Sequence, residues 1–157
     1  MKPASISQIK NELKHKNPEE TMELCLKLAR FKKENKELLS YLLFEEHNEL
    51  GFINDIKEEI DLEFSNINNS SYYYIKKSVR KILRTIKKYI RFSKKKETEV
   101  ELLIYFCKKL RTMKPSIDNN LALFNIYYNQ KVSVKKTIKK LHEDLQYDYE
   151  IEIEELY

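Results

Sequence analysis

Apolar residues recur at spacings of three and four along most of the chain, which is the pattern of amphipathic helices. A first helix opens on Ser5 and Gln8, which form a capping-box pair. A second opens on Asn17 and Pro18, an N-cap followed by proline at the first helical position, and runs to about Phe31. The apolar residues of this second helix are expected to face inward: Met22, Cys25, Leu26, Leu28 and Ala29.

The same periodicity predicts further helices, separated by a break near Asn35 and by the polar loops 65–71 and 112–120. A third helix passes through Leu38 and Leu43 and ends at about Asn48, and a fourth runs from Ile53 to Phe64. A fifth includes Ile75 and Ile90, and a sixth runs from about Thr98 to Leu110. A seventh runs from Leu121 to about Asn129 and carries Phe124 and Tyr128, and an eighth runs from Ser133 through Ile138 and Leu141 to Leu145.

The last residues, 147–157, carry a different pattern. Apolar and acidic residues alternate from Tyr147 to Ile153, which is typical of a strand, but no other segment offers a strand to pair with. An extended acidic tail and a frayed helix both remain open for this stretch. The helical pattern of the chain predicts one all-α domain over 1–157, with seven to eight short helices stacked as antiparallel pairs.

A weak internal echo refines this fold class. The segment "ELCLKLARF…KELLSYLLFE" resembles "ELLIYFCKKL…NNLALFNIYY", 78 residues further on. Each reads as a Glu-Leu-led apolar helix, a polar link and a second helix rich in Leu and aromatics. A four-helix unit used twice would give a small α-solenoid-like stack of the HEAT kind.

Composition excludes several function classes. With a single glycine, Gly51, the chain cannot carry a Gly-rich phosphate loop or a dinucleotide-binding fingerprint. The first residues lack the apolar stretch of a signal peptide, and the longest apolar run, 102–107, is far shorter than the roughly 20 residues of a membrane span. The two cysteines, Cys25 and Cys107, sit in apolar runs and are expected to be buried and reduced, as in a cytoplasmic protein.

The net charge of +5 is unevenly distributed. Residues 1–64 carry 10 basic and 14 acidic side chains, residues 65–96 carry 11 basic and no acidic ones, and residues 97–157 carry 9 and 11. The high isoelectric point therefore comes from one segment, "YYYIKKSVRKILRTIKKYIRFSKKK". On a helical wheel this segment has an apolar edge, Ile75, Val79, Ile82, Leu83, Ile86 and Ile90. Its cationic outer face holds Lys76, Lys77, Arg80, Lys81, Arg84, Lys87, Lys88 and Arg91.

Two interpretations of that outer face stay open. In the first, the protein is a non-enzymatic interaction module whose cations meet an acidic partner protein or its own acidic segments, 45–63 and 143–155. In the second, the same cations bind DNA or RNA, and Tyr72–Tyr74 and Tyr89 stack on bases. No helix-turn-helix, zinc finger or RNA-binding signature accompanies the patch. A membrane surface fits less well, because the apolar edge is expected to be used in the core.

Candidate catalytic and metal-binding residues are few. His15, His47 and His142 lack ligand spacing to one another or to a cysteine, and "EEHNE" around His47 has neither the Glu-x-x-His nor the His-Glu-x-x-His order. No Ser, Cys or Lys has an identifiable base in sequence. We therefore expect no enzymatic activity, no cofactor and no metal.

Three short runs resemble an uncharacterised family of small bacterial all-helical proteins, a domain of unknown function. They are Asn35-Lys36-Glu37-Leu38-Leu39, Tyr41-Leu42-Leu43-Phe44 and Arg80-Lys81-Ile82-Leu83-Arg84. The resemblance covers most of the chain and implies a cytoplasmic helical protein, but it implies no activity.

Overall fold

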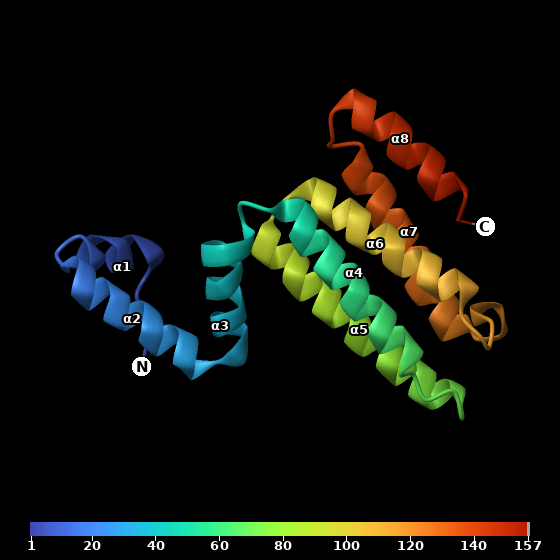
Figure 1. Cartoon of the computed structure of the whole chain (residues 1–157), viewed down its shortest axis with the longest axis horizontal. Coiled ribbons are helices and arrows are strands. Elements are labelled where there is room, and N and C mark those ends of the chain that lie inside the picture. The colour runs from blue at the N-terminus through green and yellow to red at the C-terminus, as the bar shows by residue number, and fades with distance from the viewer. Residues whose placement is uncertain (157) are drawn as a thin grey trace. The chain divides into compact units, whose positions relative to one another are not determined.

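The computed structural model describes residues 1–156, and within them the chain forms eight α-helices and no strand (Figure 1). This confirms the all-α fold. The chain divides into two compact units, Met1–Phe44 and Glu45–Tyr157, where the sequence led us to expect one domain. No helix in the described part of the chain is both long and apolar enough to cross a bilayer.

The N-terminal unit contains the helices α1 (Ile6–Leu13), α2 (Pro18–Phe31) and α3 (Lys33–Ser40). The predicted capping box of α1 and the predicted N-cap of α2 are both confirmed, and Asn17 and Glu20 also form a capping box. In α1 the Ser5 hydroxyl accepts from the Gln8 backbone N–H, and in α2 the Asn17 side chain accepts from the backbone N–H three residues on. These side chains satisfy backbone donors that a helix start leaves without partners.

The turn between α2 and α3 falls earlier than expected. Lys32 adopts an extended conformation and ends α2, whereas the sequence predicted a break near Asn35. The Asn35 amide instead donates to the Leu28 carbonyl oxygen at 2.8 Å, which ties the first turn of α3 to the end of α2. A π-helical turn, Tyr41–Glu45, follows α3.

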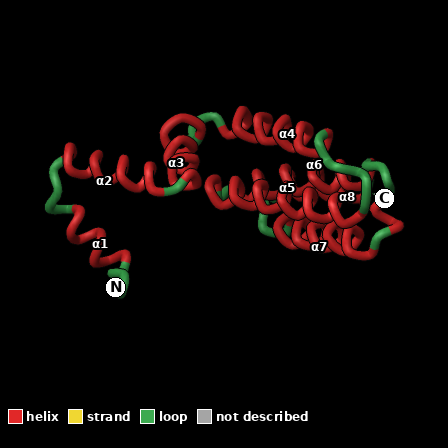
Figure 2. Tube along the Cα trace, turned by 90° about the horizontal axis from the view of Figure 1, so that it is seen from below, coloured by secondary structure: helices red, strands yellow, loops and turns green. Residues whose placement is uncertain are grey.

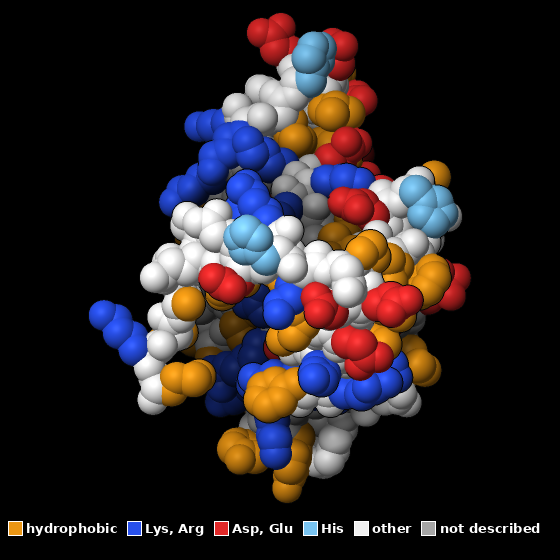
Figure 3. Space-filling view, turned by 90° about the vertical axis from the view of Figure 1, so that its left-hand side faces the viewer, with side chains coloured by type: hydrophobic (Ala, Val, Ile, Leu, Met, Phe, Trp, Pro, Cys, Tyr) orange, Lys and Arg blue, Asp and Glu red, His pale blue; other side chains and the backbone are white. Residues whose placement is uncertain are grey.

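The apolar residues of α2 are not buried, and this prediction was wrong. Met22, Cys25 and Leu28 are exposed, while Leu26 and Ala29 are only half-buried. Among residues 1–44 only Tyr41 is buried. Hydrophobic side chains also lie open between charged ones on the face drawn in Figure 3. Periodicity correctly identified an apolar face on these helices, but the N-terminal unit does not bury this face by itself.

The C-terminal unit is a stack of the five α-helices α4 to α8 (Figures 1 and 2). Helix α6 packs against α4, α5, α7 and α8, so it forms the centre of the stack. Helices that follow one another along the chain run antiparallel, as predicted. The helices are α4 (Glu49–Ser65), α5 (Tyr72–Ser93), α6 (Lys96–Thr112), α7 (Leu121–Ile138) and α8 (Glu143–Glu154).

Burial follows from the central position of α6. Its side chains are buried on most sides of the helix, including Leu102 and Phe106, and the Phe106 ring lies 5.9 Å from that of Phe64 in α4. Cys107 is buried, as the sequence predicted, and burial raises the pKa of its thiol to about 12. The predicted apolar edge of α5 is confirmed. Ile75, Val79, Ile82 and Ile86 are buried, and Leu83 and Ile90 are half-buried.

The end of the chain differs from the prediction. Helix α7 continues through Ser133, where an eighth helix was expected to begin, and α8 starts only at Glu143. Leu121, Phe124 and Tyr128 lie on the exposed side of α7. Residues 147–154, left open between tail and helix, belong to α8. The buried side of α7 carries Leu123, Tyr127, Gln130, Lys131, Val134, Thr137 and Ile138.

One carboxylate connects three helices of this stack. Glu101 of α6 accepts from Lys57 of α4 at 2.9 Å and from the Tyr149 hydroxyl of α8 at 2.8 Å. Burial acts to raise the pKa of Glu101, but these two hydrogen bonds and the charges of Lys57 and Lys108 lower it below its ordinary value of 4.5. For Tyr149, burial and the neighbouring carboxylates both raise the hydroxyl pKa.

We expect Glu101→Gln to lower the free energy of unfolding at pH 7 by about 1–3 kcal/mol, because it removes a charged acceptor from two hydrogen bonds. A carboxyl whose pKa is lowered by folding stabilises the fold above its unfolded pKa, and this contribution is lost as the pH falls through the folded pKa. Urea unfolding at pH 7 and pH 3 should therefore show a difference between wild type and variant that shrinks in acid. An equal difference at both pH values would contradict this role.

Candidate polyanion-binding face

The eight predicted site residues all lie on α5, and five of them line one groove. This cationic groove of α5 has a volume of about 740 Å³ and is lined by Tyr73, Lys76, Lys77, Arg80, Leu83, Arg84 and Lys87. Because α5 turns its isoleucines into the core, the cations that alternate with them at helical spacing must point away from it. Positions four residues apart repeat every 6 Å or so along the axis, which gives a regular row of charge.

The described part of the chain offers the cations of the groove no acidic partner. Within residues 1–156, no carboxylate lies within 4 Å of the five groove cations. The other three predicted residues lie outside the groove; they are Lys81, Lys88 and Arg91. Lys81 pairs with Glu63 of α4 at 3.4 Å, and the Lys88 ammonium lies 4.8 Å from the centre of the Tyr89 ring. The exposed cations therefore repel one another, and an anion in the groove would relieve this repulsion.

The acidic stretch 45–63 is engaged mainly with other helices. Glu49 pairs with Lys95 at 3.0 Å and Asp61 with Lys109 of α6 at 2.7 Å. Burial acts to raise the pKa of Asp61, but hydrogen bonds from Lys109 and Tyr105 lower it overall. Glu63 pairs with Lys81 of α5, which lies outside the cationic groove.

The second acidic segment, α8, packs on α6 and α7. Its Glu152 pairs with Lys108 of α6. The ion pairs of both acidic segments thus leave the cationic groove of α5 open, which the sequence alone did not reveal.

The predicted tyrosines fall into two groups. Tyr72 donates to the Ser116 carbonyl oxygen at 3.1 Å, and Tyr89 donates to Glu59 at 2.9 Å, so both are used within the fold. Tyr73 and Tyr74 are exposed, and their rings meet edge to face with centroids 5.3 Å apart. Only Tyr73 lines the cationic groove.

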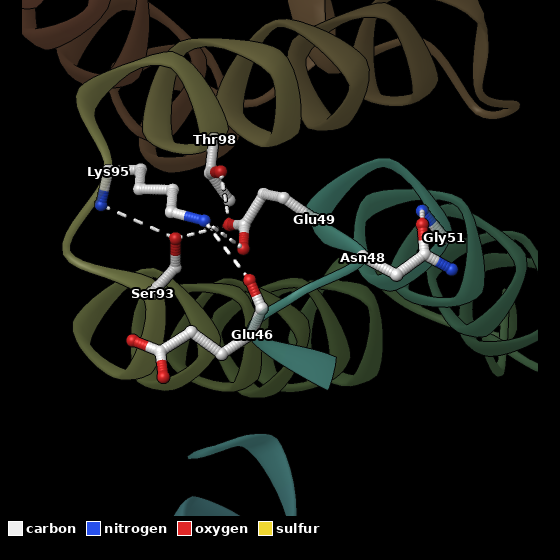
Figure 4. Close-up of polar contacts among 7 residues, drawn as sticks. All are labelled: Glu46, Asn48, Glu49, Gly51, Ser93, Lys95 and Thr98. Carbon is white, nitrogen blue, oxygen red and sulfur yellow. Dashed lines mark hydrogen bonds and ion pairs between the residues drawn. The ribbon is translucent and has the colours of Figure 1, made fainter. Parts of the chain in front are cut away.

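The segment "EEHNE" has a structural role that the sequence did not predict. Glu49 opens α4, and its carboxylate accepts from the hydroxyls of Ser93 and Thr98 and from the Lys95 ammonium (Figure 4). The Lys95 ammonium also donates to the Glu46 backbone carbonyl at 3.4 Å. This Glu49 cluster fixes the turn from α5 to α6 against the start of α4.

The glycine of this segment belongs to the same helix start. Asn48 caps α4 by accepting from the Gly51 backbone N–H at 3.2 Å. A Cβ atom at Gly51 would lie 2.4 Å from the Asn48 side-chain nitrogen, so a larger residue at this position would have to displace the capping side chain. The only glycine of the sequence, three residues after an asparagine, was the available signal for this cap.

The three histidines lie in the turns between helices. His15 and His47 are exposed, and His142 caps α8 by accepting from the Asp144 backbone N–H. No three His, Cys, Asp or Glu side chains of the described residues come together in a way that could hold a metal ion.

Comparison with known proteins adds no relative: no family model, no curated protein and no solved structure matches this chain. The resemblance to a family of small bacterial helical proteins stays a prediction.

Proposed function

We propose that the protein is a non-enzymatic interaction module and that the cationic groove of α5 binds an acidic segment of a partner protein. One observation carries this proposal: five cations line a single groove, and none has an ion-pair partner within the described chain. An external anion is favoured over the protein's own acidic segments, because those segments pair mainly with α6.

The groove also offers apolar contact between its charges. Leu83 lies half-buried in its lining, and Tyr73 adds an aromatic ring. Lys76, Arg80 and Arg84 follow at intervals of four residues, which matches carboxylates at the same interval on a facing helix. An acidic amphipathic helix is the ligand that uses both features.

A nucleic acid is the second candidate, and exposed Tyr73 at the groove is the observation that favours it. A tyrosine ring can stack on a base while the neighbouring arginines bind phosphates. Five phosphate contacts to a single strand would give a slope of about −3.5 in log affinity against log salt.

The test is a titration of two fluorescent probes, an acidic amphipathic helical peptide and a poly-dT oligonucleotide, at low and moderate salt. We expect the peptide to bind and Arg80→Glu/Arg84→Glu to weaken binding by at least about tenfold. The control is Lys136→Glu/Lys140→Glu, which makes the same charge change at exposed lysines outside the groove.

The outcomes separate the candidates. Binding of the oligonucleotide alone, lost in the α5 variant, would replace the protein partner with a nucleic acid. The proposal fails if neither probe binds at low salt, or if the control variant loses binding as much as the α5 variant does.

The solenoid-like arrangement stays a prediction for this scaffold. Each helix from α4 to α8 contacts the next along the chain, as the helices of a solenoid do, but α6 also contacts α4 and α8, as in a bundle. The two echoing segments also differ in environment, because α2 has no buried residue and α6 is buried on most sides.

A further inference from the structure

The N-terminal unit has an apolar groove of its own. This α2–α3 groove, about 530 Å³, has a floor of Leu26, Ala29, Leu39, Leu43 and Phe44 and a rim that includes Arg30, Lys33 and Lys36. Leu43 and Phe44 are both more than 60% exposed. A 44-residue unit with a single buried side chain buries too little apolar surface to be stable by itself.

The rim of this groove is cationic. Lys33 has one weak contact, with Glu37 at 3.8 Å, and neither Arg30 nor Lys36 has a carboxylate within 4 Å in the described chain. The unit as a whole carries more basic than acidic residues. Two such units facing each other would repel, so the charge favours an acidic occupant with apolar residues at its centre.

The outer face of α8 has those properties. Tyr149 and Ile153 turn into the core, and on the opposite side Tyr147 and Ile151 are 68% and 45% exposed, one helical turn apart. Carboxylates flank this exposed pair on both sides. They are Glu150 and Glu154 on one side and Asp144, Asp148 and Glu155 on the other.

We propose that the α2–α3 groove of one copy of the protein receives the outer face of α8 of a second copy. Tyr147 and Ile151 would cover the apolar floor, and the carboxylates beside them would pair with the cations of the rim. If α8 of each copy binds in the α2–α3 groove of the other copy, the same contact forms twice and produces a two-fold symmetric dimer. The cationic groove of α5 is a weaker site for α8, because its apolar lining is only Leu83 and Tyr73.

The charges allow a complementation test by sedimentation equilibrium of the full chain. Arg30→Glu/Lys36→Glu reverses the rim, and Asp148→Lys/Glu155→Lys reverses α8; all four side chains are exposed and outside the core. We expect the wild type to be a dimer at micromolar concentration and each variant alone to dissociate at least about tenfold more readily. An equimolar mixture of the two variants should dimerise again, because each reversed rim then meets a reversed helix.

A separate variant and control test the apolar contact of α8 with the floor of the α2–α3 groove. Tyr147→Ser/Ile151→Ser should dissociate the dimer, whereas Leu62→Ser, at a 62% exposed leucine of α4, should not. Circular dichroism must show helix content equal to that of the wild type for each variant. Arg80→Glu/Arg84→Glu should leave the dimer intact, which separates this contact from the function proposed for α5.

Several results would overturn the proposal. They are a wild type that is monomeric up to 0.1 mM or so, a mixture that fails to dimerise although each variant is folded, a dimer insensitive to the α8 variants, and a dimer that dissociates only when the α5 groove is reversed.

Discussion

Val79→Asp is expected to unfold the C-terminal unit. Val79 has no exposed surface, and it lies between Ile75 and Ile82 on the buried edge of α5. A carboxylate there would lose its hydration without gaining a partner, at a cost of several kcal/mol. Since a typical domain is stable by only about 5–15 kcal/mol, most of the stability would be lost. Circular dichroism and thermal unfolding measure this directly.

The neighbouring residue provides the matched control. Arg80→Asp introduces the same side chain one position further on, where the structure places an exposed residue of the cationic groove. This variant should keep the wild-type helix content and melting temperature to within a few degrees. If both variants unfold, or if Val79→Asp is tolerated, the division of α5 into a buried edge and an exposed face is wrong.

Glu49→Ala is expected to lower the free energy of unfolding by about 2–4 kcal/mol, because it leaves several donors without their acceptor. Thr98 and Ser93 are buried, and their hydroxyls both donate to Glu49, with the Thr98 bond at 2.6 Å. The Lys95 ammonium would also lose its carboxylate partner. Equilibrium urea unfolding at constant pH gives the difference.

Glu46→Ala controls for removing a carboxylate from the same segment. In Figure 4 the Glu46 side chain points away from the cluster, and the residue contributes only its backbone carbonyl oxygen. Its loss should change the free energy of unfolding by less than about 0.5 kcal/mol. Equal losses in the two variants would show that the Glu49 cluster does not stabilise the α5–α6 turn.

Local signals in the sequence predicted much of the fold. Ser5, Asn17 and Pro18 mark helix starts because cap chemistry acts over three or four residues, and all three occupy their predicted positions. The apolar edge of α5 was equally predictable, because four buried residues repeat at strict helical spacing. These features depend on neighbours along the chain alone.

The exposure of the apolar face of α2 was not predictable in the same way. Periodicity shows that a helix has an apolar face but does not say what that face meets. Met22 and Leu28 belong to an apolar face of α2, just as Val100 and Leu110 belong to one of α6. The first two are nevertheless exposed and the last two are fully buried. The difference lies in tertiary contacts, which a single sequence does not encode in any local pattern.

The predicted boundary between α7 and α8 was wrong for a related reason. Ser133 is a good N-cap residue, but Val134 and Ile138 continue the buried side of α7, and packing overrides the local signal. In α8 the alternation from Tyr147 to Ile153 resembles a strand, although Tyr149 and Ile153 are also one helical turn apart. Short apolar runs leave helix and strand ambiguous.

The sequence identified the residues of the cationic groove but not their environment. The helical periodicity of α5 placed the cations on one face, and the structure groups five of them around Leu83. Where the carboxylates of 45–63 point depends on how α4 rotates against α6. That rotation brings Asp61 to Lys109 and Glu49 to Lys95 instead of to the groove.

The central claim is that residues 1–156 leave the groove cations of α5 without ion-pair partners, and the unfolding free energy of Arg80→Glu/Arg84→Glu tests this claim most directly. At low salt the variant should be as stable as the wild type or more stable by up to about 1 kcal/mol, because the reversed charges would attract neighbouring lysines on the helix. The difference should vanish at 1 M salt. A loss of more than about 1 kcal/mol at low salt that disappears at high salt would show that carboxylates of the chain already neutralise these arginines.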